Sequence, residues 1–148
     1  MNTKRIPNSV AWLGYGGLVP FLVFAGLSLT EPAHQIIYRS ALLSYGAVIL
    51  SFVGAIQWGF AMIAPELTDP QRRSGYLWSA VPALMAWFTV FLGPVTSALI
   101  LILGFLVQYW RDLALRSQMN LPTWFLPLRL RLTSVACISL ALGAYTVF

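Results

Sequence analysis

The side chain with the clearest chemical potential in this sequence is Asp112, which stands beside Arg111 and one helical turn before Arg116. A carboxylate at this spacing is expected to form an ion pair with one of the two arginines. Such a pair is either a solvated contact at the end of an apolar segment or an acid–base group for a lipid or quinone substrate. Asp112 is therefore the one candidate for catalysis.

Gln57 is expected to be the one carboxamide well inside an apolar segment. Because an unpaired amide in hydrocarbon is costly, Gln57 should face protein and bond to a hydroxyl, or to a backbone carbonyl that Pro20 or Pro82 leaves free. It would then act as glue between helices or, with the adjacent Trp58, line a site for a small polar or quinone-like ligand.

Small residues recur around Gln57 in steps of four, three, four and three. They are Ser40, Ser44, Ala47, Ser51 and Gly54. This spacing predicts one face of a left-handed helix pair, because small side chains let two backbones approach closely in lipid. The alternative is a polar pathway lined by the serine hydroxyls. A matching stripe near the C-terminus makes these two segments predicted neighbours; it consists of Ser134, Cys137, Ala141 and Ala144.

Metal and cofactor chemistry is limited by the residue counts. The chain has one cysteine, Cys137, and one histidine, His34, so a single copy cannot form an intrachain disulfide, a zinc cluster or a bis-histidine haem. His34 is expected to be a solvated imidazole near the membrane surface. No metal and no cofactor is predicted.

The composition places all these residues in a membrane protein. Of 148 residues, 59% are hydrophobic and 9% are charged, and the mean hydropathy is +0.77, whereas about 25% of residues are charged in a soluble domain. We predict one all-α domain, residues 1–148, that forms a bundle of five transmembrane helices. The helices span 9–29, 38–63, 69–92, 95–113 and 128–148. The first is expected to be uncleaved, and its first half, with three glycines and Pro20, to be bent or closely packed; the third is expected to be kinked at Pro82.

Lysine and arginine gather at one end of the predicted bundle. Two precede the first segment (Lys4 and Arg5), two lie in the second loop (Arg72 and Arg73), four surround the fourth loop (Arg111, Arg116, Arg129 and Arg131), and one lies opposite (Arg39). Because cytoplasmic loops are enriched in lysine and arginine, we predict a cytoplasmic N-terminus and an external C-terminus. Most tryptophans lie toward the cationic side as well: Trp12, Trp58, Trp78, Trp110 and Trp124.

The net charge of +5 is expected to meet lipid headgroups rather than nucleic acid, because the cations stand at the ends of apolar segments. Between residues 116 and 131, arginines alternate with aromatic residues and prolines, which is typical of a segment in the headgroup layer. The segment is either a general anchor or a defined site for an anionic lipid such as cardiolipin, or for a partner subunit. The candidate residues are Arg111, Asp112, Arg116, Trp124, Arg129 and Arg131.

Three stretches carry a resemblance that covers nearly the whole chain: the glycine-rich stretch 6–21, the stretch 45–59 that ends in Gln57-Trp58-Gly59, and the stretch 124–133. With Asp112, they resemble a family of small bacterial and mitochondrial membrane proteins, a domain family of unknown function that includes the animal transmembrane protein 69. The resemblance implies a helical inner-membrane protein of bacterial type and brings no established activity, substrate or catalytic residue. This family usually has histidine at the position of Gln57, so a hydrogen-bonding role is the one that carries over to an amide.

Three functions stay open. The first is a non-enzymatic accessory, assembly or lipid-organising subunit of the bacterial inner membrane, which contacts membrane lipids and a membrane-protein partner or a second copy of itself. The second is a small passive transporter with Gln57 and the serines of the second helix along its route. The third is an enzyme that acts on a lipid or quinone through Asp112. The small-residue stripes and the short loops favour the first.

The charge distribution makes topology testable. Reporter proteins fused at Lys4 and after Phe148 should report opposite sides of the membrane, because an odd number of crossings separates the two ends. The measurement is the activity of a cytoplasm-only and a periplasm-only reporter at each end in bacterial cells. If both ends report the same compartment, the count of five helices is wrong.

Overall fold

Apolar runs separated by proline, glycine and charged connections form α-helices in the computed structural model, which describes residues 5–145. The helices are α1 (Asn8–Gly16), α2 (Val19–Thr30), α3 (Gln35–Ile63), α4 (Asp69–Phe88), α5 (Pro94–Leu115) and α6 (Phe125–Tyr145), with short 3-10 turns at Pro32–His34 and Thr89–Phe91. No strand occurs within 5–145, so the all-α prediction is confirmed for this range. Lys4 and the predicted end of the last helix at 146–148 lie outside the described residues.

The first predicted crossing is split into two helices. α1 ends at Gly16 and α2 begins at Val19, so that Pro20 falls in the first turn of α2, where its missing N–H costs no hydrogen bond. The Tyr45 hydroxyl of α3 donates to the Gly17 carbonyl at 2.8 Å. The predicted bend is therefore present, and a side chain from α3 binds a carbonyl at the break.

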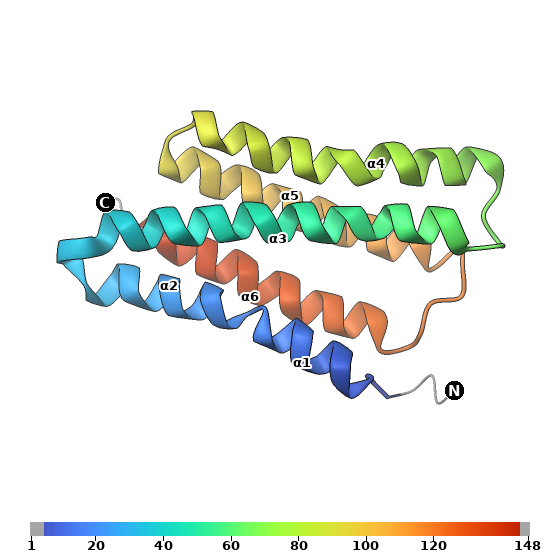
Figure 1. Cartoon of the computed structure of the whole chain (residues 1–148), viewed down its shortest axis with the longest axis horizontal. Coiled ribbons are helices and arrows are strands. Elements are labelled where there is room, and N and C mark those ends of the chain that lie inside the picture. Colours follow the sequence, from blue (N-terminus) through green and yellow to red (C-terminus); the bar gives the residue numbers. More distant parts are fainter. Residues whose placement is uncertain (1–4, 146–148) are drawn as a thin grey trace.

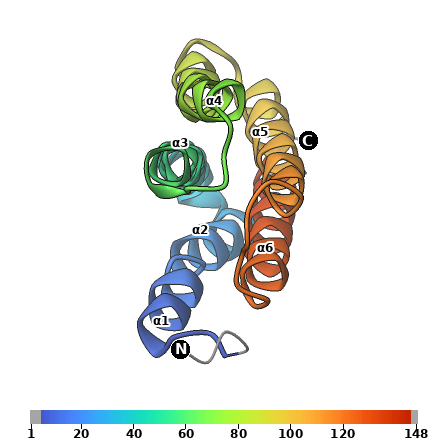
Figure 2. The ribbon, with the colours of Figure 1, turned by 90° about the vertical axis from the view of Figure 1, so that its right-hand side faces the viewer.

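The helices pack side by side in two rows. Viewed along the bundle, α4, α3 and the α1–α2 pair form one row, and α5 and α6 form the second (Figure 2). α3 packs most extensively on α4, which runs back alongside it (Figure 1). α3 also touches α6, so the prediction that these two helices are neighbours is confirmed. The contact does not run through the predicted stripes, because Ser44, Ser134 and Ala141 are exposed.

Gly54 explains why α4 is the closer neighbour of α3. A Cβ atom added at Gly54 would lie 2.7 Å from the Cβ and Cγ atoms of Pro82, which is buried within α4. Because the proline ring is stiff, only glycine allows this approach. The proline predicted to kink the third crossing is thus seated against the glycine of the neighbouring helix.

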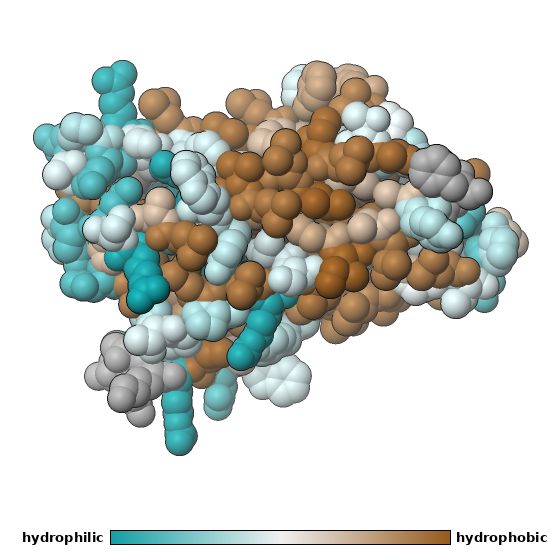
Figure 3. All heavy atoms as spheres, turned by 180° about the vertical axis from the view of Figure 1, so that it is seen from behind, coloured by the Kyte–Doolittle hydropathy of each residue, from teal (hydrophilic) through white to brown (hydrophobic). Residues whose placement is uncertain are grey.

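The outer surface of the bundle is apolar around its middle. Figure 3 shows hydrophobic residues across the centre and hydrophilic residues gathered at the end that carries the start of α1 and the α3–α4 connection. Four segments are long and apolar enough to cross a membrane: Asn8–Thr30, Pro32–Ile63, Pro94–Leu115 and Phe125–Tyr145. α4, whose first turns carry Asp69, Arg72 and Arg73, is not among them. The chain is therefore a helical bundle with four candidate spans, and the fifth crossing stays a prediction.

The Gly54–Pro82 contact can be tested by adding a methyl group. Gly54→Ala should lower the free energy of unfolding in detergent by about 1 to 3 kcal/mol, because the Cβ atom overlaps the Pro82 ring. Gly59→Ala on the same helix is the matched control, since nothing lies within 4 Å of its added Cβ atom. This control should gain about 0.5 to 1 kcal/mol from helix propensity. Equal effects of the two substitutions would contradict the close approach of α3 and α4.

Candidate functional site

Asp112 lies at the centre of a buried polar cluster. Its side chain is almost completely enclosed, with the residue 1% exposed. Oδ2 accepts a charge-assisted hydrogen bond from Arg129 Nε at 2.7 Å, which forms an ion pair between α5 and α6. Oδ1 accepts from Gln57 Nε2 at 3.0 Å and from Gln108 Nε2 at 3.1 Å. The carboxylate is thus satisfied by three protein donors.

The cluster extends through Gln108 to α4. Trp78 Nε1 donates to Gln108 Oε1 at 2.9 Å, so both ends of that amide are hydrogen-bonded. We call Asp112, Arg129, Gln57, Gln108 and Trp78 the Asp112 network. It joins α3, α4, α5 and α6 through side chains.

The local sequence explains how the network is assembled. Gln108 and Asp112 stand four residues apart on α5 and therefore lie on one face of the helix. Asp112 is near the C-terminal end of α5 and Arg129 near the N-terminal end of α6, where the helix dipoles disfavour charges of these signs. Neither charge stabilises its own helix. Each is instead stabilised by the other across the α5–α6 interface.

The predicted partner of Asp112 is wrong. The sequence indicated Arg111 or Arg116 and a solvated pair, whereas Asp112 is buried and paired with Arg129. Arg116 is exposed, and Arg111 lies with its guanidinium carbon 5.0 Å from the centre of the Trp78 ring. There are two physical reasons. Arg111 adjoins Asp112 and points to another side of α5, where it meets the Trp78 ring. Arg116 lies beyond Leu115, where α5 ends.

Gln57 is buried among protein atoms, as expected, but it bonds to a carboxylate instead of a hydroxyl or a carbonyl. The residues predicted to share its site are elsewhere. Trp58 is exposed and packs on the Tyr76 ring, and Ser44 is exposed on a groove near the opposite end of the bundle. The Ser51 hydroxyl donates to the Ala47 carbonyl of its own helix. These side chains do not converge on a common site with Gln57.

Sequence reasoning missed Gln108 and the role of Trp78. Gln108 is 0% exposed and lies inside the fourth predicted segment, so Gln57 is not the one buried carboxamide. The signal was present in the spacing of Gln108 and Asp112, which are one helical turn apart. Trp78 was assigned to an interfacial belt, but its indole N–H serves the network.

The residues predicted to bind an anionic lipid are not gathered into one site. Arg129 belongs to the interior, and Trp124 is half-buried against Phe125. Arg131 is exposed and donates to the Tyr15 hydroxyl of α1 at 3.1 Å. Arg116 lines an open groove of about 400 Å³ beneath the α5–α6 connection. Of the six predicted residues, only Asp112 and Arg129 belong to the Asp112 network.

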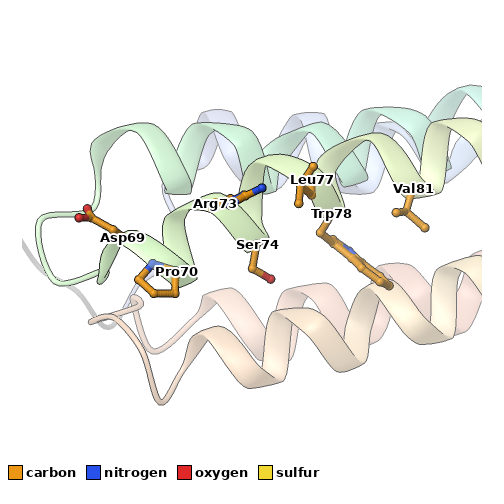
Figure 4. Close-up of a pocket in the computed structure, with 7 residues that line it drawn as sticks. All are labelled: Asp69, Pro70, Arg73, Ser74, Leu77, Trp78 and Val81. Carbon is orange, nitrogen blue, oxygen red and sulfur yellow. The ribbon is translucent and has the colours of Figure 1, made fainter.

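Two arginines of the α4 start have different surroundings. Arg72 donates to the carbonyls of Ala61 and Ala64, where α3 ends, so it caps that helix as a cation at its C-terminus. Arg73 lies on a wide groove of about 600 Å³ (Figure 4). All labelled side chains of this groove, Asp69 among them, come from α4. The groove is therefore the open surface of one helix, and it carries both a positive and a negative side chain.

Within 5–145, no three His, Cys, Asp or Glu side chains come together as a set of metal ligands.

Comparisons with known proteins identify relatives. The profile of a family described as "Protein of unknown function (DUF3429)" matches residues 6–145. Transmembrane protein 69 of Xenopus tropicalis is 37% identical over 143 residues, which are 93% of this chain and 54% of the relative. Transmembrane protein 69 of Mus musculus is 29% identical over 136 residues, 90% of this chain and 54% of the relative. The chain thus spans about half the length of these curated relatives. No solved structure matches.

The Asp112 network predicts the effect of replacing Gln57. Gln57→Leu should lower the free energy of unfolding by about 1 to 3 kcal/mol, because Asp112 Oδ1 loses a buried donor. Gln57→His keeps an N–H donor at this position and should lose less. Ser51→Ala on the same helix is the control, since its hydroxyl bonds only within α3. Chemical unfolding in detergent measures all three, and a gain in stability for Gln57→Leu would contradict the network.

Proposed function

Because the chain belongs to the family described as "Protein of unknown function (DUF3429)", whose relatives named above are transmembrane proteins, we propose that it is a non-enzymatic accessory subunit of a bacterial inner membrane that binds anionic lipid. The bundle with its four candidate spans supports a multi-pass membrane protein. The accessory role, the bacterial inner membrane and the lipid are the proposal.

In this proposal α4 crosses the membrane as the fifth helix, with the N-terminus in the cytoplasm and the C-terminus outside. Two observations support this topology. α4 lies alongside α3 (Figure 1), so a bilayer that surrounds α3 also meets α4. The most hydrophilic residues gather at one end of the bundle (Figure 3), and this is the end that a cytoplasmic N-terminus would place in the cytoplasm.

The single observation that carries the lipid proposal is the groove beside Arg116. Arg116 is the charged residue among its lining side chains, and the walls include Leu113, Leu121, Leu126 and Leu130. A cation above apolar walls fits an anionic lipid, with its headgroup on the guanidinium and an acyl chain along the leucines. The proposed lipid site therefore stays at the α5–α6 connection, where the sequence predicted it, and is centred on Arg116.

The Asp112 network supports a structural role over catalysis or transport. A general acid or base needs access to a substrate proton, and Asp112 is enclosed by three protein donors. A passive route along Gln57 needs the serine hydroxyls beside it, and Ser44 and Ser51 are directed elsewhere. These polar groups serve helix packing.

Anionic lipid retention tests the Arg116 groove. Arg116→Gln should weaken cardiolipin binding about fivefold in native mass spectrometry, because one cation near an anionic lipid contributes about 1 kcal/mol. Binding of a zwitterionic lipid should be unchanged. Arg73→Gln is the matched control, since it removes one exposed cation from the same end where Asp69 offsets the charge. An equal loss of cardiolipin binding in both variants would indicate a diffuse cationic surface and contradict a defined site at Arg116.

A further inference from the structure

Apart from the open grooves described above, a cavity lies where α1, α2, α3 and α6 meet. Its volume is about 100 Å³. Its floor is made of buried apolar residues, including Phe21, Val53 and Ala136. Leu13 and Phe52 also line it and are exposed on the outer apolar surface. The cavity therefore opens sideways, toward the hydrocarbon of the membrane, between α1 and α3.

Two buried polar atoms of residues that line this cavity have no partner within the described part of the chain. They are Arg129 Nη2 and Thr133 Oγ1. Both residues line the cavity, and their exposed fractions are 6% and 4%. They stand four residues apart on α6, which places them on one face of the helix. Buried donors are almost always satisfied, so an acceptor in the cavity would supply the partner that both atoms lack.

The Thr133 hydroxyl differs from other hydroxyls of the bundle. A serine or threonine in an apolar helix usually donates to a carbonyl three or four residues earlier. Thr30 donates to Gly26 and Ser51 to Ala47 in this way. The Thr133 hydroxyl makes no such hydrogen bond, so it is free to bind a ligand together with Nη2.

The charges around the cavity favour a neutral acceptor over an anion. Arg129 is the charged residue among the described residues that line it, and its positive charge is already balanced by Asp112 at 2.7 Å. Adding an anion would leave a net negative charge in a buried apolar site, which is costly. A carbonyl oxygen accepts hydrogen bonds from both groups without adding charge.

The size and depth of the cavity favour an acyl chain. A cavity of about 150 Å³ holds a benzene ring, and the volume here is smaller, so it suits a few methylene groups of a chain better than a ring. Arg129 is the fifth residue of α6, about 6 Å from the helix start at 1.5 Å per residue. If α6 begins at the membrane surface, this distance would place Arg129 at the boundary between headgroups and hydrocarbon, where lipid ester groups lie.

We propose that Arg129 Nη2 and Thr133 Oγ1 bind the ester carbonyl of a membrane lipid whose acyl chain enters the cavity between α1 and α3. The site is distinct from the Arg116 groove and does not rest on the proposed function.

The test uses the full chain in an alkyl maltoside detergent, which contains no carbonyl group. The probe is methyl decanoate with a ¹³C-labelled carbonyl, followed by the infrared C=O stretch. The bound ester should show a saturable second band at lower wavenumber, because a guanidinium and a hydroxyl donate to its oxygen. Thr133→Val should weaken this binding roughly 3- to 10-fold, as expected for one hydrogen bond. Thr89→Val is the control, since this buried threonine donates to its own helix at Ala86.

A second pair of variants blocks the cavity without touching the polar atoms. Gly14 lines the cavity, and Gly14→Leu should abolish ester binding by filling it. Gly16→Leu is its control, because nothing lies within 4 Å of an added Cβ atom there. Three competition results would overturn the proposal. The first is tighter binding of decanoate than of the methyl ester, and the second is displacement of the ester by undecane as effectively as by unlabelled ester. The third is displacement of the ester by decylubiquinone. Unchanged binding in both Thr133→Val and Gly14→Leu would also overturn it.

Discussion

The buried ion pair between Asp112 and Arg129 is the contact on which the bundle depends. Two opposite charges in a low-dielectric interior cannot be separated cheaply, because each would remain buried without its partner. Gln57 and Gln108 complete the shell around the carboxylate, and Trp78 binds the second amide. One carboxylate thus fixes the rotation of α5 against α3 and α6, and through Gln108 against α4.

The α1–α2 pair stands outside this network. It is tied to α3 by the Tyr45 hydroxyl and by apolar packing of Phe21, whose ring meets Tyr45 and Phe105 edge to face. A cavity lies beside the break after Gly16, and Arg129, whose buried Nη2 has no partner within the described residues, lines it. The same arginine therefore forms the ion pair with Asp112 and also lines the cavity that we propose to bind lipid.

Hydropathy and local signals were sufficient to predict the helices, the bend before Pro20 and the burial of Gln57, because each depends on a few neighbouring residues. The pairing of Asp112 with Arg129 could not be predicted in this way. The two residues are separated by the α5–α6 connection, and the rotation of each helix is decided by packing such as Gly54 against Pro82. Small-residue stripes were ambiguous because several faces of each helix carry small side chains.

A double-mutant cycle tests the Asp112–Arg129 pair most directly. The free energy of unfolding in detergent is compared for the original chain, Asp112→Leu, Arg129→Leu and the double variant. Each single variant should lose about 3 to 5 kcal/mol, because it leaves an unpaired buried charge, and the double variant should lose much less than the sum. Additive losses would contradict the account, since they would mean that the two charges do not depend on each other.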